Sequence, residues 1–214
     1  MVPGFTRTSG YYGRFTGPAG EKKFFDTIIN SAVDTTAENI TSLNLIPQGV
    51  TESTRVGRKC TITNIHCKGF ILWSSASSFT TLAASRIRVV LVQDTQCNGA
   101  NAAYTDVYAS TTTVAWRNMS NSTRFKVLKE WIITPPNMAA TTSDNWATSA
   151  NTIGFCSPTK LKFNMACQIP LEFSSTIGAI TEIRSNNLTV MAVSDAGDDI
   201  HTLYLNCRVR YTDQ

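Results

Sequence analysis

A length of 214 residues suits one large β-rich domain or two small ones and is ample for a hydrophobic core. Charged residues make up only 16% of the chain and the net charge is +4, which argues against a helical bundle, a coiled coil and a charge-rich disordered protein. Threonine and serine supply 49 of the 214 residues, and because they favour strands and turns the composition indicates an all-β protein. With no run of 18 apolar residues, no membrane-spanning helix is expected, and no signal peptide is evident.

Residues 1–20 differ from the rest of the chain. Five of the twelve glycines fall there, between aromatic residues and the cations Arg7 and Arg14. Without any periodicity that could build a core element, this segment predicts an N-terminal arm in front of one domain over residues 21–214. Aromatic and arginine side chains spaced by glycine can stack on bases and contact phosphates, or the arm can pack on a neighbouring subunit.

From residue 21 onward the pattern is typical of strands. The first is predicted over Glu21–Ile29, and a short extended piece at Ser42–Ile46 precedes a turn at residues 47–49. The next strand shows one slip in its apolar alternation, between Ile62 and Ile65, which predicts a β-bulge. The strands predicted after the turn are Lys59–Trp73, Arg86–Gln93, Arg124–Ile133, Lys160–Phe173, Ile177–Arg184, Leu188–Val193 and His201–Tyr211.

About eight strands, no long helix and two long connections favour an all-β fold, a single eight-stranded jelly roll of two four-stranded antiparallel sheets. The connections cover residues 94–123 and 134–159. No motif of fixed period repeats along the chain.

Few residues suit catalysis. The chain has two histidines and no phosphate-binding loop, dinucleotide fingerprint or nucleophile elbow, so neither an enzymatic activity nor a cofactor is expected. Carboxylates and an imidazole at Asp195, Asp198, Asp199 and His201 could bind a divalent cation, but Asp-rich stretches with glycine are also ordinary turns.

No Cys-x-x-Cys pair occurs, and three of the six cysteines lie in apolar strand-like runs that predict buried thiols: Cys60, Cys67 and Cys207.

Basic residues gather on predicted strands and before them, with few acids nearby. Strand-face cations are either solvated or available to neutralise phosphates, each phosphate contact adding salt-dependent, sequence-independent affinity. The candidate nucleic-acid-binding residues are Arg7, Arg14, Lys22, Lys23, Arg55, Arg58, Lys59, Arg124, Lys126, Arg208 and Arg210.

An ordered series of segments resembles the capsid proteins of small circular Rep-encoding single-stranded DNA viruses, the circovirus-like group. The resemblance runs from about residue 12, where YGRF has a counterpart in environmental members, to the end of the chain, and is weakest over Thr134–Thr159. The segments are KFFDT at 23–27, SLNLIPQG at 42–49, TESTRVGRK at 51–59, RIRVVLVQDTQCNGA at 86–100 and STRFKVL at 122–128.

The resemblance implies a jelly roll that assembles with copies of itself into a small icosahedral, T=1-like shell around circular single-stranded DNA. It implies a location in the virion and in the host cell, with the nucleus as a compartment during assembly, and an unidentified host receptor. It also implies no enzymatic activity. Family members typically begin with a long Arg-rich arm, whereas the first 23 residues here hold four basic residues, so packaging would rely on the inner wall or on a segment not given.

In naming the strands of that fold, we take Lys59–Trp73 as the first and Arg124–Ile133 as the third. This naming places five cations on one outer sheet face, which we expect to meet the genome together with the arm. These cations are Lys59, Arg124, Lys126, Arg208 and Arg210.

The connection at residues 95–123 is polar, lightly charged and contains aromatic residues. Capsid loops of this kind commonly form contacts between subunits, which makes Tyr104, Tyr108 and Trp116 candidate interface anchors, while the alternative is a loop packed on its own domain.

For the whole chain, the competing interpretations are a carbohydrate-binding or adhesin-type jelly roll and a cupin-like enzyme. The scarcity of histidine disfavours the second.

Overall fold

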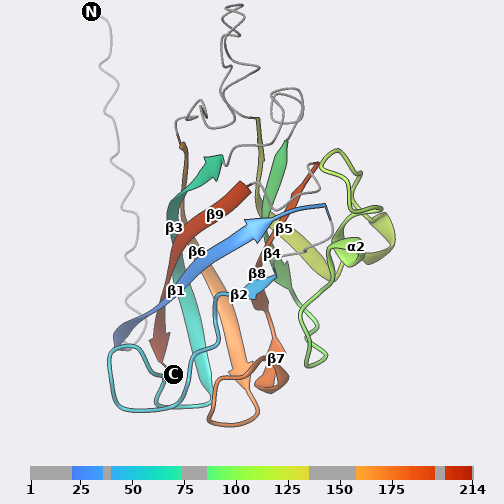
Figure 1. Ribbon diagram of the computed structural model, residues 1–214. Coiled ribbons are helices and arrows are strands. Elements are labelled where there is room, and N and C mark those ends of the chain that lie inside the picture. Colours follow the sequence, from blue (N-terminus) through green and yellow to red (C-terminus); the bar gives the residue numbers. More distant parts are fainter. Residues whose placement is uncertain (1–20, 36–39, 74–85, 135–157, 196–200, 214) are drawn as a thin grey trace, which may run out of the picture.

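The computed structural model describes residues 21–35, 40–73, 86–134, 158–195 and 201–213, so the predicted arm and its Arg7 and Arg14 lie outside the described residues (Figure 1). Short helical turns are α2 (Tyr104–Val107), η1 (Met119–Asn121) and η2 (Ile180–Glu182). The strands are β1 (Lys22–Val33), β2 (Thr41–Ser42), β3 (Lys59–Trp73), β4 (Ile87–Asp94), β5 (Phe125–Ile133), β6 (Thr159–Phe173), β7 (Ile183–Ser185), β8 (Asn187–Ser194) and β9 (His201–Asp213).

The strands form two antiparallel sheets. One has the order β1-β9-β3-β6-β7 and the other the order β2-β8-β4-β5. Strands that follow one another in sequence often lie in opposite sheets, and the last strand, β9, lies between β1 and β3, which is the jelly-roll arrangement. The prediction of an all-β jelly roll is confirmed, with β7 as a short fifth strand at one sheet edge.

The strand naming from the sequence needs a correction. β1 extends to Val33 and pairs with β9 along its whole length, and the short extended piece after it contributes β2. Lys59–Trp73 is therefore the third strand of the jelly roll, and Arg124–Ile133 corresponds to the fifth, which lies in the other sheet. The expectation that Arg124 and Lys126 share a face with Lys59, Arg208 and Arg210 is wrong.

The main core lies between the two sheets. In β3 the inward-facing side chains are buried, and the register with both neighbours shifts between Ile62 and Asn64, so the predicted bulge is confirmed. In β9 every second side chain is buried, as its alternation predicts. The three thiols predicted to be buried lie in this core: Cys60, Cys67 and Cys207.

A second hydrophobic cluster covers the other face of the four-stranded sheet. The segment that carries α2 packs there, on the side away from β1 and β9 (Figure 1). Both faces of this sheet are thus buried, which explains why β4 and β8 are buried along their whole length. The cluster comprises Val90, Val92, Ala102, Tyr104, Val107, Tyr108, Phe125, Met191 and Val193.

Candidate nucleic-acid interface

The outer face of the five-stranded sheet carries most of the exposed cations of the described strands. Side chains alternate between the core and this face along β1, β9, β3 and β6. We call these outward-facing positions the basic face; within the described strands it also carries two carboxylates, Asp26 and Glu172. Its cations are Lys22, Lys59, Lys68, Lys160, Lys162, Arg208 and Arg210.

One of these cations is paired. The guanidinium of Arg208 donates to both carboxylate oxygens of Asp26, at 2.7 and 2.6 Å, and lies 4.4 Å from the centre of the Phe24 ring. This pairing lowers the pKa of Asp26. In the part of the chain that the structure describes, the other six cations of the basic face form no ion pair, so the face has a net excess of positive charge.

Two of the predicted phosphate-binding residues are buried and structural. The ammonium of Lys23 bonds Glu21 at 3.2 Å, Asp213 at 3.0 Å and the carbonyl of Thr54 at 3.0 Å, which ties β1 to the end of β9. Arg55 lies fully buried in the connection before β3. Neither side chain faces solvent, which differs from the expectation.

The Arg55 guanidinium holds three stretches of chain together. It donates to the carbonyls of Ile46, Gly57 and Ser175 and lies 4.1 Å from the centre of the Phe173 ring. Buried guanidinium groups require such acceptors, and here they come from residues up to 120 positions away. Arg58, in the same connection, is exposed.

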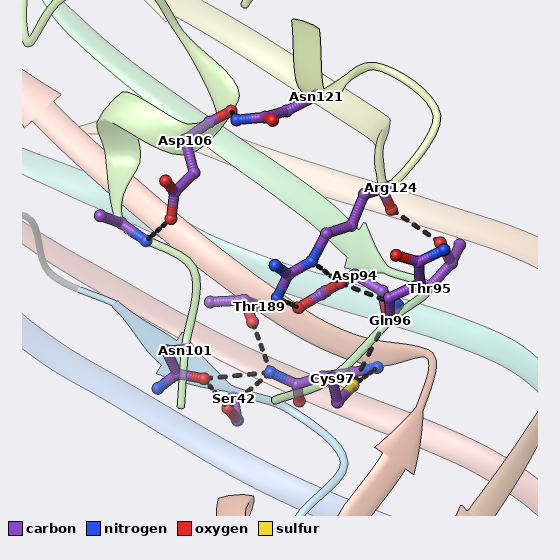
Figure 2. Close-up of polar contacts among 12 residues, drawn as sticks. Ser42, Asp94, Thr95, Gln96, Cys97, Asn101, Asp106, Asn121, Arg124 and Thr189 are labelled. Atoms are coloured by element: carbon purple, nitrogen blue, oxygen red, sulfur yellow. Dashed lines mark hydrogen bonds and ion pairs between the residues drawn. The ribbon is translucent and has the colours of Figure 1, made fainter. Parts of the chain in front are cut away.

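Arg124, directly before β5, and Lys126 within it belong to a different environment. Arg124 forms a two-pronged ion pair with Asp94, with both nitrogen–oxygen distances at 2.8 Å, and its backbone carbonyl accepts from Thr95 (Figure 2). Lys126 is exposed, but on the four-stranded sheet. These two residues therefore do not join the basic face.

Polar contacts fix the segment after β4 to its own sheet. The side-chain oxygen of Asn101 accepts from Ser42 at 2.5 Å and from Asn187 at 3.0 Å, and Asn187 also donates to Thr189 at 2.9 Å (Figure 2). The Asp106 carboxylate accepts from the backbone N–H of Ala103 at 2.9 Å and so closes the first turn of α2. The segment is thereby held as part of the domain.

Of the three predicted interface anchors, one is on the surface. Tyr104 and Tyr108 are buried in the second cluster, with their rings stacked 4.9 Å apart, so they fit the alternative of a loop packed on its own domain. Trp116 is 87% exposed, and Val114 and Met119 in the same segment are also exposed. This part of the segment presents an apolar surface to solvent.

The suggested cation site is not assembled in the described part of the chain. Asp195 accepts from Arg86 at 3.0 Å and from the Thr113 hydroxyl at 2.6 Å, while His201 lies buried against Trp73. The other two residues, Asp198 and Asp199, lie outside the described residues. Among the residues described, no group of three possible metal ligands gathers, and no helix has the length and apolar character to cross a membrane.

Three cations of the basic face were missing from the sequence-based set. Lys68 follows the bulge in β3, and Lys160 and Lys162 alternate with buried or half-buried residues along β6. The sequence feature that could have identified them is the alternation of apolar and polar residues that also predicted the strands. The outward register of β3 adds Lys68, and knowing that β6 is the neighbour of β3 adds Lys160 and Lys162.

No protein-family model matches the chain. A search of curated proteins gives no match. Among solved structures the chain is similar to Desmodium yellow mottle tymovirus, with 11% identity and a TM-score of 0.34 over 99% of this chain and 91% of that chain. It is also similar to the BFDV capsid protein of a 60-mer, with 9% identity and a TM-score of 0.31 over 91% and 92% of the two chains. A third similar structure, cocksfoot mottle virus, has 14% identity and a TM-score of 0.27 over 89% and 95%.

Proposed function

We propose that the chain is a viral capsid protein that assembles with copies of itself into a small icosahedral, T=1-like shell around circular single-stranded DNA. Its role is structural rather than enzymatic. Such a protein would reside in the virion and, during assembly, in the host cell, including its nucleus. The proposal is supported by the ordered series of capsid-like segments and by the jelly-roll strand order.

The charge of the basic face is the observation that carries the proposal. Seven cations and two carboxylates project from four neighbouring strands, and only Arg208 among those cations is paired within the described chain. A surface of this sign and spacing attracts phosphates regardless of sequence, as a genome container requires. In the assembled shell this face, together with residues 1–20, would line the interior and contact the genome.

The segment between β4 and β5 suits contact with other subunits. The second cluster gives the segment after β4 a fixed shape, and Trp116, Val114 and Met119 leave apolar surface exposed on it. Aromatic residues are enriched where protein interfaces gain most of their energy. We therefore propose Trp116 as a contact between subunits, while Tyr104 and Tyr108 support it from the core.

The test is a measurement of particle size together with the ratio of absorbance at 260 and 280 nm on the purified chain. For a subunit of 23.4 kDa a closed shell predicts particles on the order of 1 MDa or larger that contain nuclease-protected nucleic acid. A monomer or small oligomer without nucleic acid would contradict the proposal and would favour the carbohydrate-binding jelly roll instead.

A further inference from the structure

A pair of aromatic rings lies on the basic face, near the end of β3 and the start of β9. Phe70 on β3 and Tyr204 on β9 are direct partners across the two strands, and their rings stack with centroids 5.0 Å apart and an interplanar angle of 23°. Phe70 is 37% exposed, so part of its side chain faces solvent. Gly69 brings the two strands unusually close here, because a Cβ at that position would overlap the carbonyl of Tyr204.

Cations and amides surround this pair. Lys160 on β6 is the strand partner of Phe70, and Lys68 is the next outward-facing residue along β3. Lys68 in turn has Lys162 and Asn206 as its partners on either side. Neighbouring strands are about 5 Å apart and outward positions on one strand about 7 Å apart, so three ammonium groups lie within one or two side-chain lengths of the rings.

The two carboxylates of the basic face lie away from the rings. Asp26 is bound to Arg208, which is four residues from Tyr204 along β9. Glu172 is the strand partner of Lys59, at the far end of β3. An anionic ligand on the rings would therefore meet attraction from the lysines without a nearby carboxylate of the described strands to oppose it.

A ligand that carries both a flat aromatic face and a phosphate matches this arrangement. A nucleotide of a single strand has both, whereas in a duplex the base faces are covered by their neighbours. We propose that Phe70 and Tyr204 form a stacking platform for an unpaired base, with Lys68, Lys160 and Lys162 holding the adjacent phosphates. This inference rests on the proposed contact between the basic face and the genome, and it adds a preference for single strands that charge alone does not supply.

The test compares the affinity of the full-length chain for oligothymidylate, oligouridylate and a DNA duplex of equal length at one salt concentration. Stacking on an aromatic side chain contributes a factor of about 5 to 150 per base, so Phe70→Leu is expected to lower single-strand affinity by that factor. Duplex affinity should be unchanged. Because every base has a flat face, DNA and RNA strands should lose affinity alike, and a loss confined to one of them would contradict the platform.

Two controls separate the ring from the surface around it. Leu72→Ala changes a residue of the same strand and face with 38% exposure, close to that of Phe70, and should leave single-strand affinity unchanged. Phe70→Tyr keeps the ring and should retain wild-type affinity. If Phe70→Leu fails to fold, photocrosslinking of an iodouracil-containing strand to the wild-type chain replaces it, and crosslinks at Phe70 or Tyr204 are expected.

The outcomes distinguish this inference from the proposed function. A wild-type chain that binds neither single strands nor duplexes would overturn the genome contact and the platform together. A chain that binds nucleic acid, but whose Phe70→Leu variant keeps its single-strand affinity or loses duplex affinity equally, overturns the platform alone. Crosslinks at residues other than Phe70 and Tyr204 would likewise overturn the platform alone.

Discussion

The salt dependence of nucleic-acid binding should measure how many phosphates the lysines of the basic face contact. We predict that replacing Lys68 and Lys162 together by alanine makes the affinity for a single strand less sensitive to salt. These two residues face each other across β3 and β6, are exposed, and form no ion pair within the described chain. Their loss should therefore leave the fold intact while it removes two phosphate contacts.

The magnitude follows from counterion release. Six unpaired cations of the basic face, if all reach phosphates, give a slope of log affinity against log salt of about −4 for a single strand. Removal of Lys68 and Lys162 reduces this slope to about −3. Between about 50 and 200 mM salt, the wild-type chain should lose affinity by about 300-fold and the double variant by about 50-fold.

Fluorescence anisotropy with a labelled oligothymidylate, titrated at several salt concentrations, measures both slopes. Lys126→Ala is the matched control because Lys126 is exposed on the other sheet, and its slope should equal that of the wild type. A double variant with the wild-type slope, or an equal change in the Lys126 control, would refute the assignment of the basic face.

Three further predictions concern stability and assembly. Arg55→Leu leaves the carbonyls that the guanidinium binds without a donor and should lower the free energy of unfolding by about 3 kcal/mol or more in urea titration; a loss below about 1 kcal/mol would show that these bonds contribute little. Burial opposes ionisation of Glu182, but N–H donation from the backbone of Gly178 and Ile177 prevails and lowers the pKa of its carboxyl group. This stabilisation is present above the ordinary pKa of a glutamate and is lost as the pH falls through the lowered value. The difference in melting temperature between wild type and Glu182→Gln should therefore narrow as the pH falls below the ordinary glutamate pKa, and a constant difference would contradict the prediction. Trp116→Ala should reduce the yield of large particles in sedimentation with an unchanged melting temperature, and a wild-type yield would exclude Trp116 as a subunit contact.

The sequence predicted most strands well because their apolar alternation is local. The strand predicted over Ile177–Arg184 is wrong, since that segment holds the helical turn η2 and only the short strand β7 (Ile183–Ser185). The slip in β3 and the alternation of β9 both appear in the structure where the residue pattern places them. β5 is an exception: Phe125 and Val127 pack on the second cluster while Trp131 and Ile133 pack on the main core, because the register with β4 shifts in between. In the sequence these four apolar residues stand at alternating positions, as if they shared one face.

Which strands become neighbours is not a local property, and here the sequence-based account failed. β2 has only two residues, too few for a periodic signal, so the strand naming from the sequence omits it and places β5 in the wrong sheet. Likewise, the sequence does not distinguish the buried cations from the exposed ones. Arg55 and Arg58 have similar sequence surroundings, but Arg55 is buried because carbonyls from distant parts of the chain accept its hydrogen bonds.

The nucleic-acid content of assembled particles tests the central claim most directly. The double variant Arg210→Glu, Lys68→Glu reverses two unpaired charges of the basic face. It leaves intact the ion pair between Arg208 and Asp26, which joins β9 to β1. Absorbance at 260 and 280 nm of size-selected particles should show full-sized shells with much less nuclease-protected nucleic acid than the wild type. Shells of the variant that contain as much nucleic acid as the wild type would contradict the account.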